Sequence, residues 1–296
     1  MNRNIHKIIA GLMSLLLLSF ISCFGQISKT PTFCWMVLSK KTQTPSFIFG
    51  TIHHLGPKPV LDNKELMRII MRCKLIVQEA DTSELLHSTH PGFDFTSDTA
   101  LDELLGYSDY QYVKYEFFKA TGKDIEQYKF RMPQAIMLMI EKGKKDKEIY
   151  KSKMPLMENA FYALSVVKKI PIKGLETRQD IFNIMYKGMP LQDQAKLLLH
   201  SLKDHSFNCS EEIMNACFEK QDLSCFCKVD DMNHYTAPGD STIILKRNLF
   251  WIKNIRNYIE QGNVFIAVGA AHLCGNFGII SLLKKDGYTI VPVMTK

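Results

Sequence analysis

Apolar runs near the start of the chain predict a β-hairpin, a helix and a strand. Residues 33–38 and 47–52 are rich in β-branched and aromatic side chains, and a polar segment with Pro45 separates them, which is typical of a hairpin. Residues 62–73 carry apolar side chains at helical spacing, and Asp62 is expected to cap this helix. Residues 75–77 form a short apolar run that predicts a buried strand.

The middle of the chain has helical patterning. Residues 101–105, 110–118 and 133–141 show the 3.6-residue spacing of amphipathic helices. A further helix is expected to start at Pro155, and residues 171–176 are expected to form a strand. Residues 178–228 return to helical spacing, and no internal repeat is visible.

The last third predicts a long helix followed by a βαβ unit. Asp240 or Ser241 is expected to cap the long helix and Gly262 to end it. Its expected apolar face consists of Leu245, Leu249, Ile252, Ile255 and Ile259. Residues 264–268 form a continuous apolar run, as in the middle of a parallel sheet. A tight turn over 269–273, a helix over 276–285 and a strand over 288–293 complete the unit.

These elements predict a single α/β domain over residues 26–296. Strand-rich segments lie at both ends of the chain, and helical segments lie between them. We therefore expect a mixed, largely parallel sheet built from both chain ends, with a large helical insertion at about residues 100–260.

Residues 1–25 have the layout of a secretory signal peptide. Arg3 and Lys7 precede an apolar run over residues 8–21, and small residues follow. Cleavage after Gly25 would give an exported protein, periplasmic or secreted. The alternative is a lipoprotein that is anchored to the membrane through Cys23. Nothing else in the sequence is apolar over a length that spans a bilayer.

Composition and charge exclude several classes of protein. The chain has 296 residues, of which 46% are hydrophobic and 23% are charged, so it is neither disordered nor fibrous. The net charge of +7 falls to +5 when Arg3 and Lys7 are removed, since 37 − 2 − 30 = 5. The densest basic cluster, over residues 142–147, is interrupted by acidic residues and predicts a solvated surface. No nucleic-acid partner is expected.

Cysteines are concentrated in one segment. The chain has eight cysteines, and Cys209, Cys217, Cys225 and Cys227 lie close together. In an exported protein this crowding predicts one or two disulfides that tie the segment. A zinc knuckle is the alternative, although the Cys-x-Cys spacing is shorter than zinc sites use.

Polar side chains follow four of the predicted strands. His53 and His54 come after the second strand, Glu79 after the third, Glu176 after the fourth and His272 after the fifth. The carboxyl ends of strands in an open α/β sheet are where ligands bind. Two imidazoles and one or two carboxylates suit a divalent metal ion, and they suit acid–base catalysis without a metal equally well.

Each of these residues also has an ordinary structural interpretation. Glu79 could pair with Arg72, Glu176 could pair with Arg178, and His54 could be solvated. The joint pattern favours a site because all the residues are expected at one edge of one sheet. Twice the pattern is Gly-x-x-His after an apolar strand, and the glycine permits a sharp turn or a close approach.

Together the motifs of the chain resemble those of the TraB/PrgY/GumN family over roughly residues 33–293. The motifs are Gly50-Thr51-Ile52-His53-His54-Leu55, Glu79-Ala80-Asp81, Gly174-Leu175-Glu176-Thr177, Arg247-Asn248 and Gly269-Ala270-Ala271-His272-Leu273. The family resembles the Tiki metalloproteases and, more distantly, the erythromycin esterase and ChaN haem-binding group. Two features depart from its pattern: a Cys-rich segment over 208–231, and the absence of a membrane tether at the C-terminus of the kind some relatives carry.

The resemblance implies a metal-dependent hydrolase, by expectation a peptidase. Its metal ligands would be His53, His272 and Glu79, with manganese, cobalt or zinc as the ion. Glu79, Glu176 and Arg247 would be catalytic, and Arg247 would hold a carboxylate or an oxyanion. Pairing of Arg247 with Glu176 or Glu79 is the alternative. The residues expected to bind substrate are His54, Asn248, Gly50 and Gly269.

Two other functions remain open from the sequence. The same residues could bind a peptide or haem without turnover, as in a sequestering protein. They could also hydrolyse an ester without a metal, with a histidine that activates water and Glu79 that orients it. The expected partner is a peptide or small-molecule substrate, and a membrane would be contacted only through a lipid on Cys23.

Overall fold

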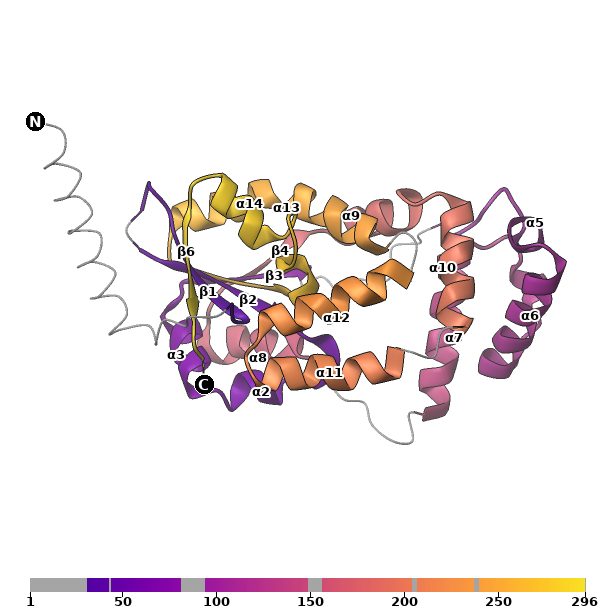
Figure 1. Cartoon of the computed structure of the whole chain (residues 1–296), viewed down its shortest axis with the longest axis horizontal. Helices are drawn as coiled ribbons and strands as arrows, with labels where there is room; N and C mark the ends of the chain where they lie inside the picture. The colour runs from indigo at the N-terminus through magenta and orange to yellow at the C-terminus, as the bar shows by residue number, and fades with distance from the viewer. Residues whose placement is uncertain are drawn as a thin grey trace, which may run out of the picture.

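A six-stranded sheet forms the centre of the protein (Figure 1). The computed structural model describes residues 31–42, 44–80, 94–148, 156–203, 207–236 and 240–295, so the predicted signal peptide and Cys23 lie outside the described residues. In chain order the strands are β1 (Cys34–Leu38), β2 (Ser46–Thr51), β3 (Leu75–Ala80), β4 (Ile172–Glu176), β5 (Val264–Gly269) and β6 (Thr289–Val293). Their spatial order is β4-β3-β5-β2-β1-β6.

The sheet is mixed and largely parallel, as predicted. The neighbours β4, β3, β5 and β2 are all parallel to one another, whereas β1 is antiparallel to both β2 and β6. The predicted hairpin is confirmed by the pairing of β1 with β2. Strand β5 lies between β3 and β2 inside the sheet. Its side chains are apolar on both faces, as this position requires, and Phe265 and Ile266 are fully buried.

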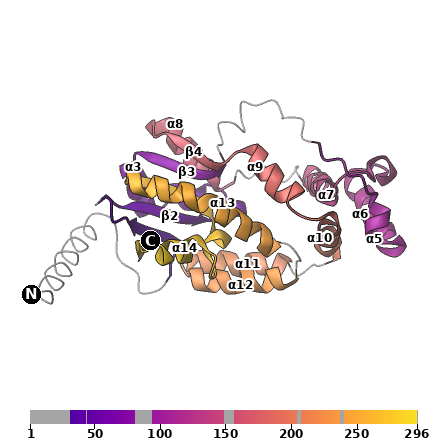
Figure 2. The same cartoon turned by 90° about the horizontal axis from the view of Figure 1, so that it is seen from above.

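Helices cover both faces of the sheet (Figures 1 and 2). On one face lie α13 (Asp240–Gln261) and α14 (Ile279–Lys285), and on the other lie α2 (Lys58–Leu61), α3 (Lys64–Arg72) and α8 (Glu158–Lys168). Phe161 of α8 packs against Phe49 and Phe265, with ring centroids 6.2 and 5.6 Å apart. The helices α11 (Phe207–Glu219) and α12 (Leu223–Thr236) place Phe218 and Phe226 against Phe33.

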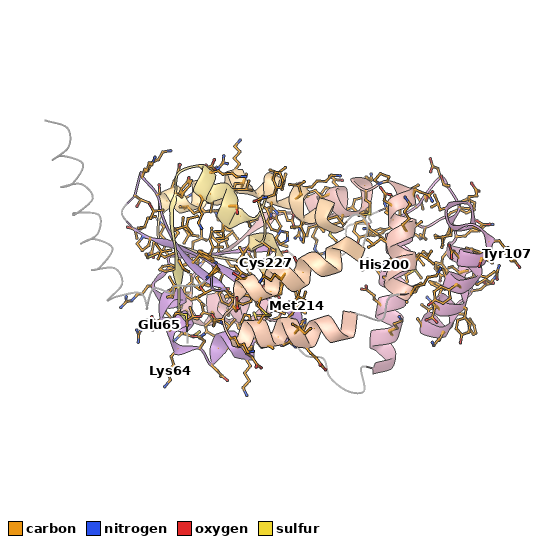
Figure 3. All side chains as sticks on the ribbon, in the orientation of Figure 1. Lys64, Glu65, Tyr107, His200, Met214 and Cys227 are labelled. Carbon is orange, nitrogen blue, oxygen red and sulfur yellow. A yellow bond between two sulfur atoms is a disulfide. The ribbon has the colours of Figure 1, made fainter. Side chains whose placement is uncertain are left out.

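A second group of helices has its own apolar core. It consists of α5 (Leu101–Leu105), α6 (Tyr107–Thr121), η2 (Ile125–Tyr128), α7 (Pro133–Glu148) and α10 (Leu191–Lys203). Figure 3 shows this helical lobe at one end of the molecule, where Tyr107 and His200 are labelled. The helix α9 (Arg178–Phe182) and the π-helical turn η3 (Asn183–Lys187) lead into it. Within the expected insertion at about 100–260, β4, α8 and α13 instead belong to the layers of the sheet.

Several helix boundaries and faces differ from the prediction. Asn63 caps α3 through its side chain, which accepts from Leu66 N, whereas Asp62 ends α2. The helix expected from Pro155, which lies outside the described residues, begins at Glu158. The buried face of α13 does not include Leu249, which is 52% exposed, because its neighbour Asn248 faces inward instead.

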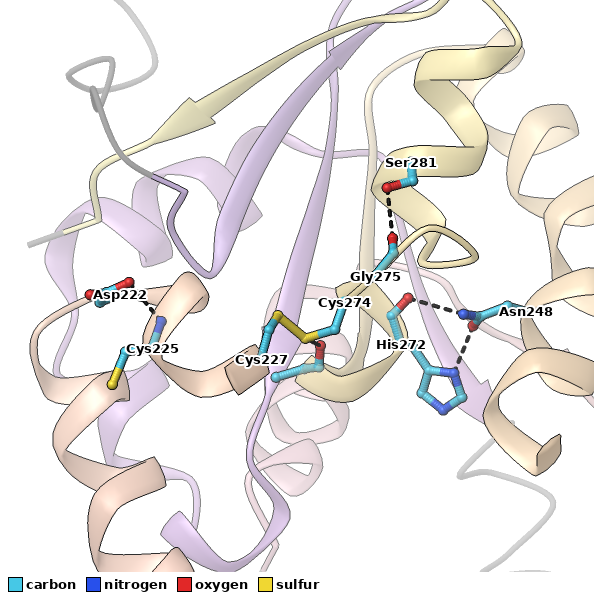
Figure 4. Close-up of a disulfide and its surroundings, with 9 residues drawn as sticks. Asp222, Cys225, Cys227, Asn248, His272, Cys274, Gly275 and Ser281 are labelled. Atoms are coloured by element: carbon cyan, nitrogen blue, oxygen red, sulfur yellow. Dashed lines mark hydrogen bonds between the residues drawn. A yellow bond between two sulfur atoms is a disulfide. The ribbon is translucent and has the colours of Figure 1, made fainter. Parts of the chain in front are cut away.

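Two disulfides link the Cys-rich segment. Cys217 pairs with Cys225 inside the segment, so the predicted disulfide within it is confirmed. Cys227 pairs with Cys274, which lies outside the segment (Figure 4). The two disulfides engage three of the four cysteines that a zinc knuckle in this segment would use. Among the residues that the structure describes, no helix is long and apolar enough to cross a membrane.

Candidate active site

The carboxyl ends of the four parallel strands bring the predicted polar residues together. Glu176 ends β4, Glu79 lies one residue before the end of β3, and Gly269 ends β5. The short turn η1 (His53–Leu55) follows β2, and the turn η4 (Ala270–Leu273), which carries His272, follows β5. Since these strands are neighbours and run in one direction, their ends lie at one edge of the sheet.

Arg247 of α13 lies between the two carboxylates. Its Nη2 donates to Glu79 Oε2 at 2.6 Å and to Glu176 Oε1 at 2.5 Å, and its Nε donates to Glu176 Oε1 at 3.1 Å. The alternative in which Arg247 pairs with Glu176 or Glu79 is therefore the one observed, and Arg247 pairs with both. Glu176 has a fully buried side chain, and the other two are mostly buried, so this pairing is shielded from water.

The two carboxyls have opposite pKa shifts. Burial would raise the pKa of Glu79, but the Arg247 guanidinium and a hydrogen bond from Gly269 N to Glu79 Oε1 at 2.6 Å bring it down to about 2. Burial raises the pKa of Glu176, and its bonds to Arg247 and to Trp251 oppose that rise. Glu79 is therefore the firmly ionised carboxylate of the site.

His272 is buried and held as one tautomer (Figure 4). Its Nε2 lies 3.2 Å from Arg247 Nη1, which can only donate, so Nε2 accepts and Nδ1 carries the proton. Nδ1 donates to Asn248 Oδ1 at 2.7 Å, and Asn248 Nδ2 in turn donates to the His272 and Phe277 carbonyls. Burial lowers the pKa of His272 to about 4. The imidazole is therefore neutral at pH 7.

Trp251 supports this cluster from one turn further along α13. The Arg247 Cζ lies 4.4 Å from the centroid of the indole ring, and the His272 ring centroid also lies 4.4 Å from that ring. The indole Nε1 donates to Glu176 Oε2 at 2.8 Å. Trp251 was not among the residues predicted from the sequence, although its position four residues after Arg247 places both side chains on one face of the helix.

His53 is the exposed member of the cluster. Its side chain is 58% exposed, and its Nδ1 lies 2.7 Å from Glu158 Oε1 at the start of α8. Interaction with the Glu158 carboxylate raises the pKa of His53. Glu158 was not predicted as a site residue either, because nothing in its own segment of the sequence indicates that the start of α8 lies beside η1.

Gly269 is the point where these side chains meet. A methyl group built on Gly269 would lie 3.2 Å from Glu79 Oε1, 3.6 Å from His272 Cδ2 and 3.8 Å from His53 Nε2. A methyl group on Gly50 would instead lie 3.1 Å from the Ala270 backbone. The absence of a side chain at Gly50 therefore lets β2 pack closely against η4, whereas at Gly269 it leaves room within the site.

The sequence of the chain matches one protein family over most of its length. The profile of the TraB/PrgY/gumN family matches residues 33–292, from before β1 to within β6. The chain belongs to the TraB/PrgY/gumN family. It matches no curated protein and no solved structure. The matched range of this TraB/PrgY/gumN protein contains the whole charged cluster around Arg247.

Two of the residues expected to bind substrate make contacts within the protein. His54 Nε2 lies 2.7 Å from Asn215 Oδ1 of α11. Asn248 is buried, and its amide oxygen and nitrogen are engaged by the three hydrogen bonds given above. In this family member Asn248 therefore holds His272 in place, and a role for His54 in substrate binding stays a prediction.

The expected metal ligands have other partners in this arrangement. Among the described residues, no group of three or more His, Cys, Asp and Glu side chains is placed to hold a metal ion. Both Glu79 oxygens accept hydrogen bonds, from Arg247 and from Gly269 N, and His272 Nε2 faces the same guanidinium. A divalent cation would have to displace Arg247, so the donor set of this TraB/PrgY/gumN protein does not fit a metal as it stands.

Proposed function

We propose that this protein is a hydrolase that activates water with a histidine and uses no metal ion. The observation that carries the proposal is the convergence of His53 Nε2, Glu79 and His272 on Gly269, with Arg247 bound to both acids. The paired carboxylates hold the guanidinium in one place, so the cluster presents a fixed cation beside an exposed base.

His53 is the residue in this proposal that takes a proton from water. Its side chain is the most exposed of the cluster, and its Nε2 faces the space beside Gly269. Imidazole is the side-chain group that most often acts as a general base in enzymes. His272 is unsuited to that role because Arg247 engages its Nε2 lone pair.

Arg247 is the group in this proposal that stabilises negative charge on the substrate. Its Nε and Nη2 donate to carboxylates, whereas Nη1 donates to the neutral His272. Nη1 carries two N–H groups, which leaves one for a substrate oxygen. A fixed cation near a developing oxyanion lowers the barrier to attack by water.

The proposed substrates are carboxylic esters or amides, peptides included. Attack of water on their carbonyl carbon develops one negative oxygen and needs one base, and the cluster supplies a partner for each. Peptide hydrolysis is the expectation that the family resemblance raised, and ester hydrolysis tests the same residues on a more reactive bond.

The test is hydrolysis of a panel of nitrophenyl esters and fluorogenic peptides by protein starting at Gln26. Turnover should survive prolonged chelation and should fall by about 10²-fold or more in His53→Gln. His200→Gln, in the helical lobe, is the control and should keep full turnover. Loss of activity on chelation, with recovery on addition of manganese, cobalt or zinc, would favour the metal-dependent peptidase.

Binding without cleavage is the other outcome that would overturn the proposal. Titration with the same peptides and with haem, followed by calorimetry and absorbance, measures it. Saturable binding by a protein that releases no product would favour a sequestering role.

We also propose that the protein functions outside the cytoplasm. The two disulfides support this, because disulfides persist in oxidising compartments. The mass of the mature protein from membrane and soluble fractions tests it. Cleavage after Gly25 would favour a soluble exported form, and a lipid on Cys23 would favour the anchored form.

A further inference from the structure

The side chain of Glu158 points at the ring nitrogen of His53 that faces away from Gly269. Glu158 Oε1 lies 2.7 Å from His53 Nδ1, and the other ring nitrogen of His53, Nε2, is the atom near Gly269. Glu158 is 16% exposed and His53 is 58% exposed. The carboxylate is thus at the protected side of the imidazole and the free nitrogen is at the open side.

Backbone contacts hold the start of α8 in this position. Met157 N donates to the His53 carbonyl at 3.1 Å. Met157 therefore binds the main chain of His53, and the next residue, Glu158, contacts its side chain. Gln78 Nε2, from the buried part of β3, donates to the Glu158 carbonyl at 3.1 Å. The start of α8 is therefore attached both to the turn η1 after β2 and to β3, the two strands that flank β5 in the sheet.

This arrangement determines which nitrogen of His53 is protonated. An ionised carboxylate has no proton to donate, so the nitrogen that it contacts must carry the hydrogen. With the proton on Nδ1, the lone pair of neutral His53 is on Nε2. Glu79 and Arg247 are the other charged groups that act on His53, and their effects on its protonation oppose each other. Glu158 is the group in direct contact.

We infer that Glu158 is a positioning residue that fixes the Nδ1–H tautomer of His53 and thereby directs the Nε2 lone pair toward the space beside Gly269. Its catalytic meaning rests on the proposed function, because the tautomer matters for turnover only if His53 is the base. A carboxylate that holds the far nitrogen of a catalytic imidazole also stabilises the imidazolium that forms when the base takes its proton.

The first experiment is nitrogen NMR of histidine-labelled protein at a pH where His53 is neutral. Nitrogen shifts separate protonated from unprotonated ring nitrogens, and His53→Gln identifies the His53 signals. The wild type should show protonated Nδ1. In Glu158→Gln that preference should weaken, because an amide can donate to Nδ1 as well as accept from it, and the His53 pKa should be lower. A wild-type His53 with protonated Nε2, or an unchanged tautomer and pKa in Glu158→Gln, would overturn the inference.

The second experiment is turnover of the same variants. Glu158→Gln should lose at least about 10-fold in kcat with little change in KM, because the base is misdirected while the rest of the site is intact. Glu158→Asp should recover part of the loss, and it also serves if Glu158→Gln does not fold. Glu116→Gln is a matched control, since Glu116 is 14% exposed and forms an ion pair with Lys119 in α6.

The two experiments separate this inference from the proposed function. If the wild type cleaves no ester or peptide, the proposed function fails, and the NMR measurement still decides the tautomer. If the wild type is active and Glu158→Gln has wild-type kcat, the inference fails and the hydrolase remains.

Discussion

The amide oxygen of Asn248 accepts the Nδ1 proton of His272 at 2.7 Å (Figure 4). The two residues lie on different elements, α13 and η4, and both are buried. Asn248 has no charge, so it fixes the ring without making it basic. A carboxylate in its place would favour the imidazolium, which would repel Arg247 only 3.2 Å away.

Stability should therefore decrease as the pH falls through the range in which His272 gains a proton. The native pKa of about 4 lies below the ordinary value of 6.5, so the unfolded chain binds more protons between these limits. The contribution of neutral His272 to the free energy of unfolding is fully present above pH 6.5. It is lost as the pH falls toward 4, by ~3 kcal/mol at most. Urea unfolding at pH 7 and pH 4.5 measures it. His272→Gln should have a smaller pH dependence, and an equal dependence in both proteins would contradict the prediction.

Removal of the bridging cation should destabilise the protein most at neutral pH. Arg247→Met leaves Glu79 and Glu176 close together without a partner, and we expect a loss of about 3–5 kcal/mol at pH 7. The loss should shrink as the pH falls, because protonation of either carboxyl relieves the repulsion. Thermal unfolding of Arg247→Met and of Arg247→Met with Glu176→Gln, each at pH 7 and pH 4, measures this. A loss that is independent of pH would exclude the carboxylates as its cause.

Gly269→Ala should affect turnover more than stability. Gly269 has a φ of −52°, which alanine adopts freely, so the free energy of unfolding should change by less than about 1 kcal/mol. The added methyl group would occupy the space between Glu79 and His53, and kcat should fall at least about 10-fold. Gly50→Ala is the contrasting variant, since its methyl group meets Ala270 and Leu273 and should cost about 1–3 kcal/mol. Equal stability losses in the two variants would contradict this assignment.

Loss of the Cys227–Cys274 disulfide, which lies next to the site, should lower turnover more than loss of Cys217–Cys225. Cys227–Cys274 joins residues 47 positions apart, and Cys274 lies two residues after His272, whereas Cys217–Cys225 spans 8 positions. Loop entropy gives upper limits of about 4 and 2.5 kcal/mol for their stabilisation. The serine variants of each pair, compared by urea unfolding and by kcat, test this. Comparable turnover in the two pairs would mean that Cys274 does not hold the His272 turn.

The strands and most of the site could be predicted from the sequence because their signals are local. The apolar run of β5, followed by Gly269 and His272, identifies a buried strand and the turn after it without reference to any other segment. Parallel strands then place Glu79 and Glu176 at the same edge. A site at this edge of the sheet was expected because polar residues follow four of the predicted strands.

The residues that the sequence did not reveal depend on contacts between distant segments. Glu158 acquires a role only because the start of α8 lies against the turn after β2. Cys274 looks isolated in the sequence, and only the packing of α12 against η4 brings Cys227 to it. Leu249 was assigned to the buried face because spacing alone does not show that the polar Asn248 lies inward, where it holds His272.

The position of β5 also sets the order in which the chain can fold. Residues 264–269 lie close to the C-terminus, yet they form the strand that separates β2 from β3. A nascent chain that emerges with its N-terminus first has both of these strands long before the one that must insert between them. Pairing of β5 with both strands should consequently be slow, because it joins segments that are far apart in the chain. The edges of β2 and β3 would stay unpaired until β5 has emerged, and unpaired strand edges favour aggregation.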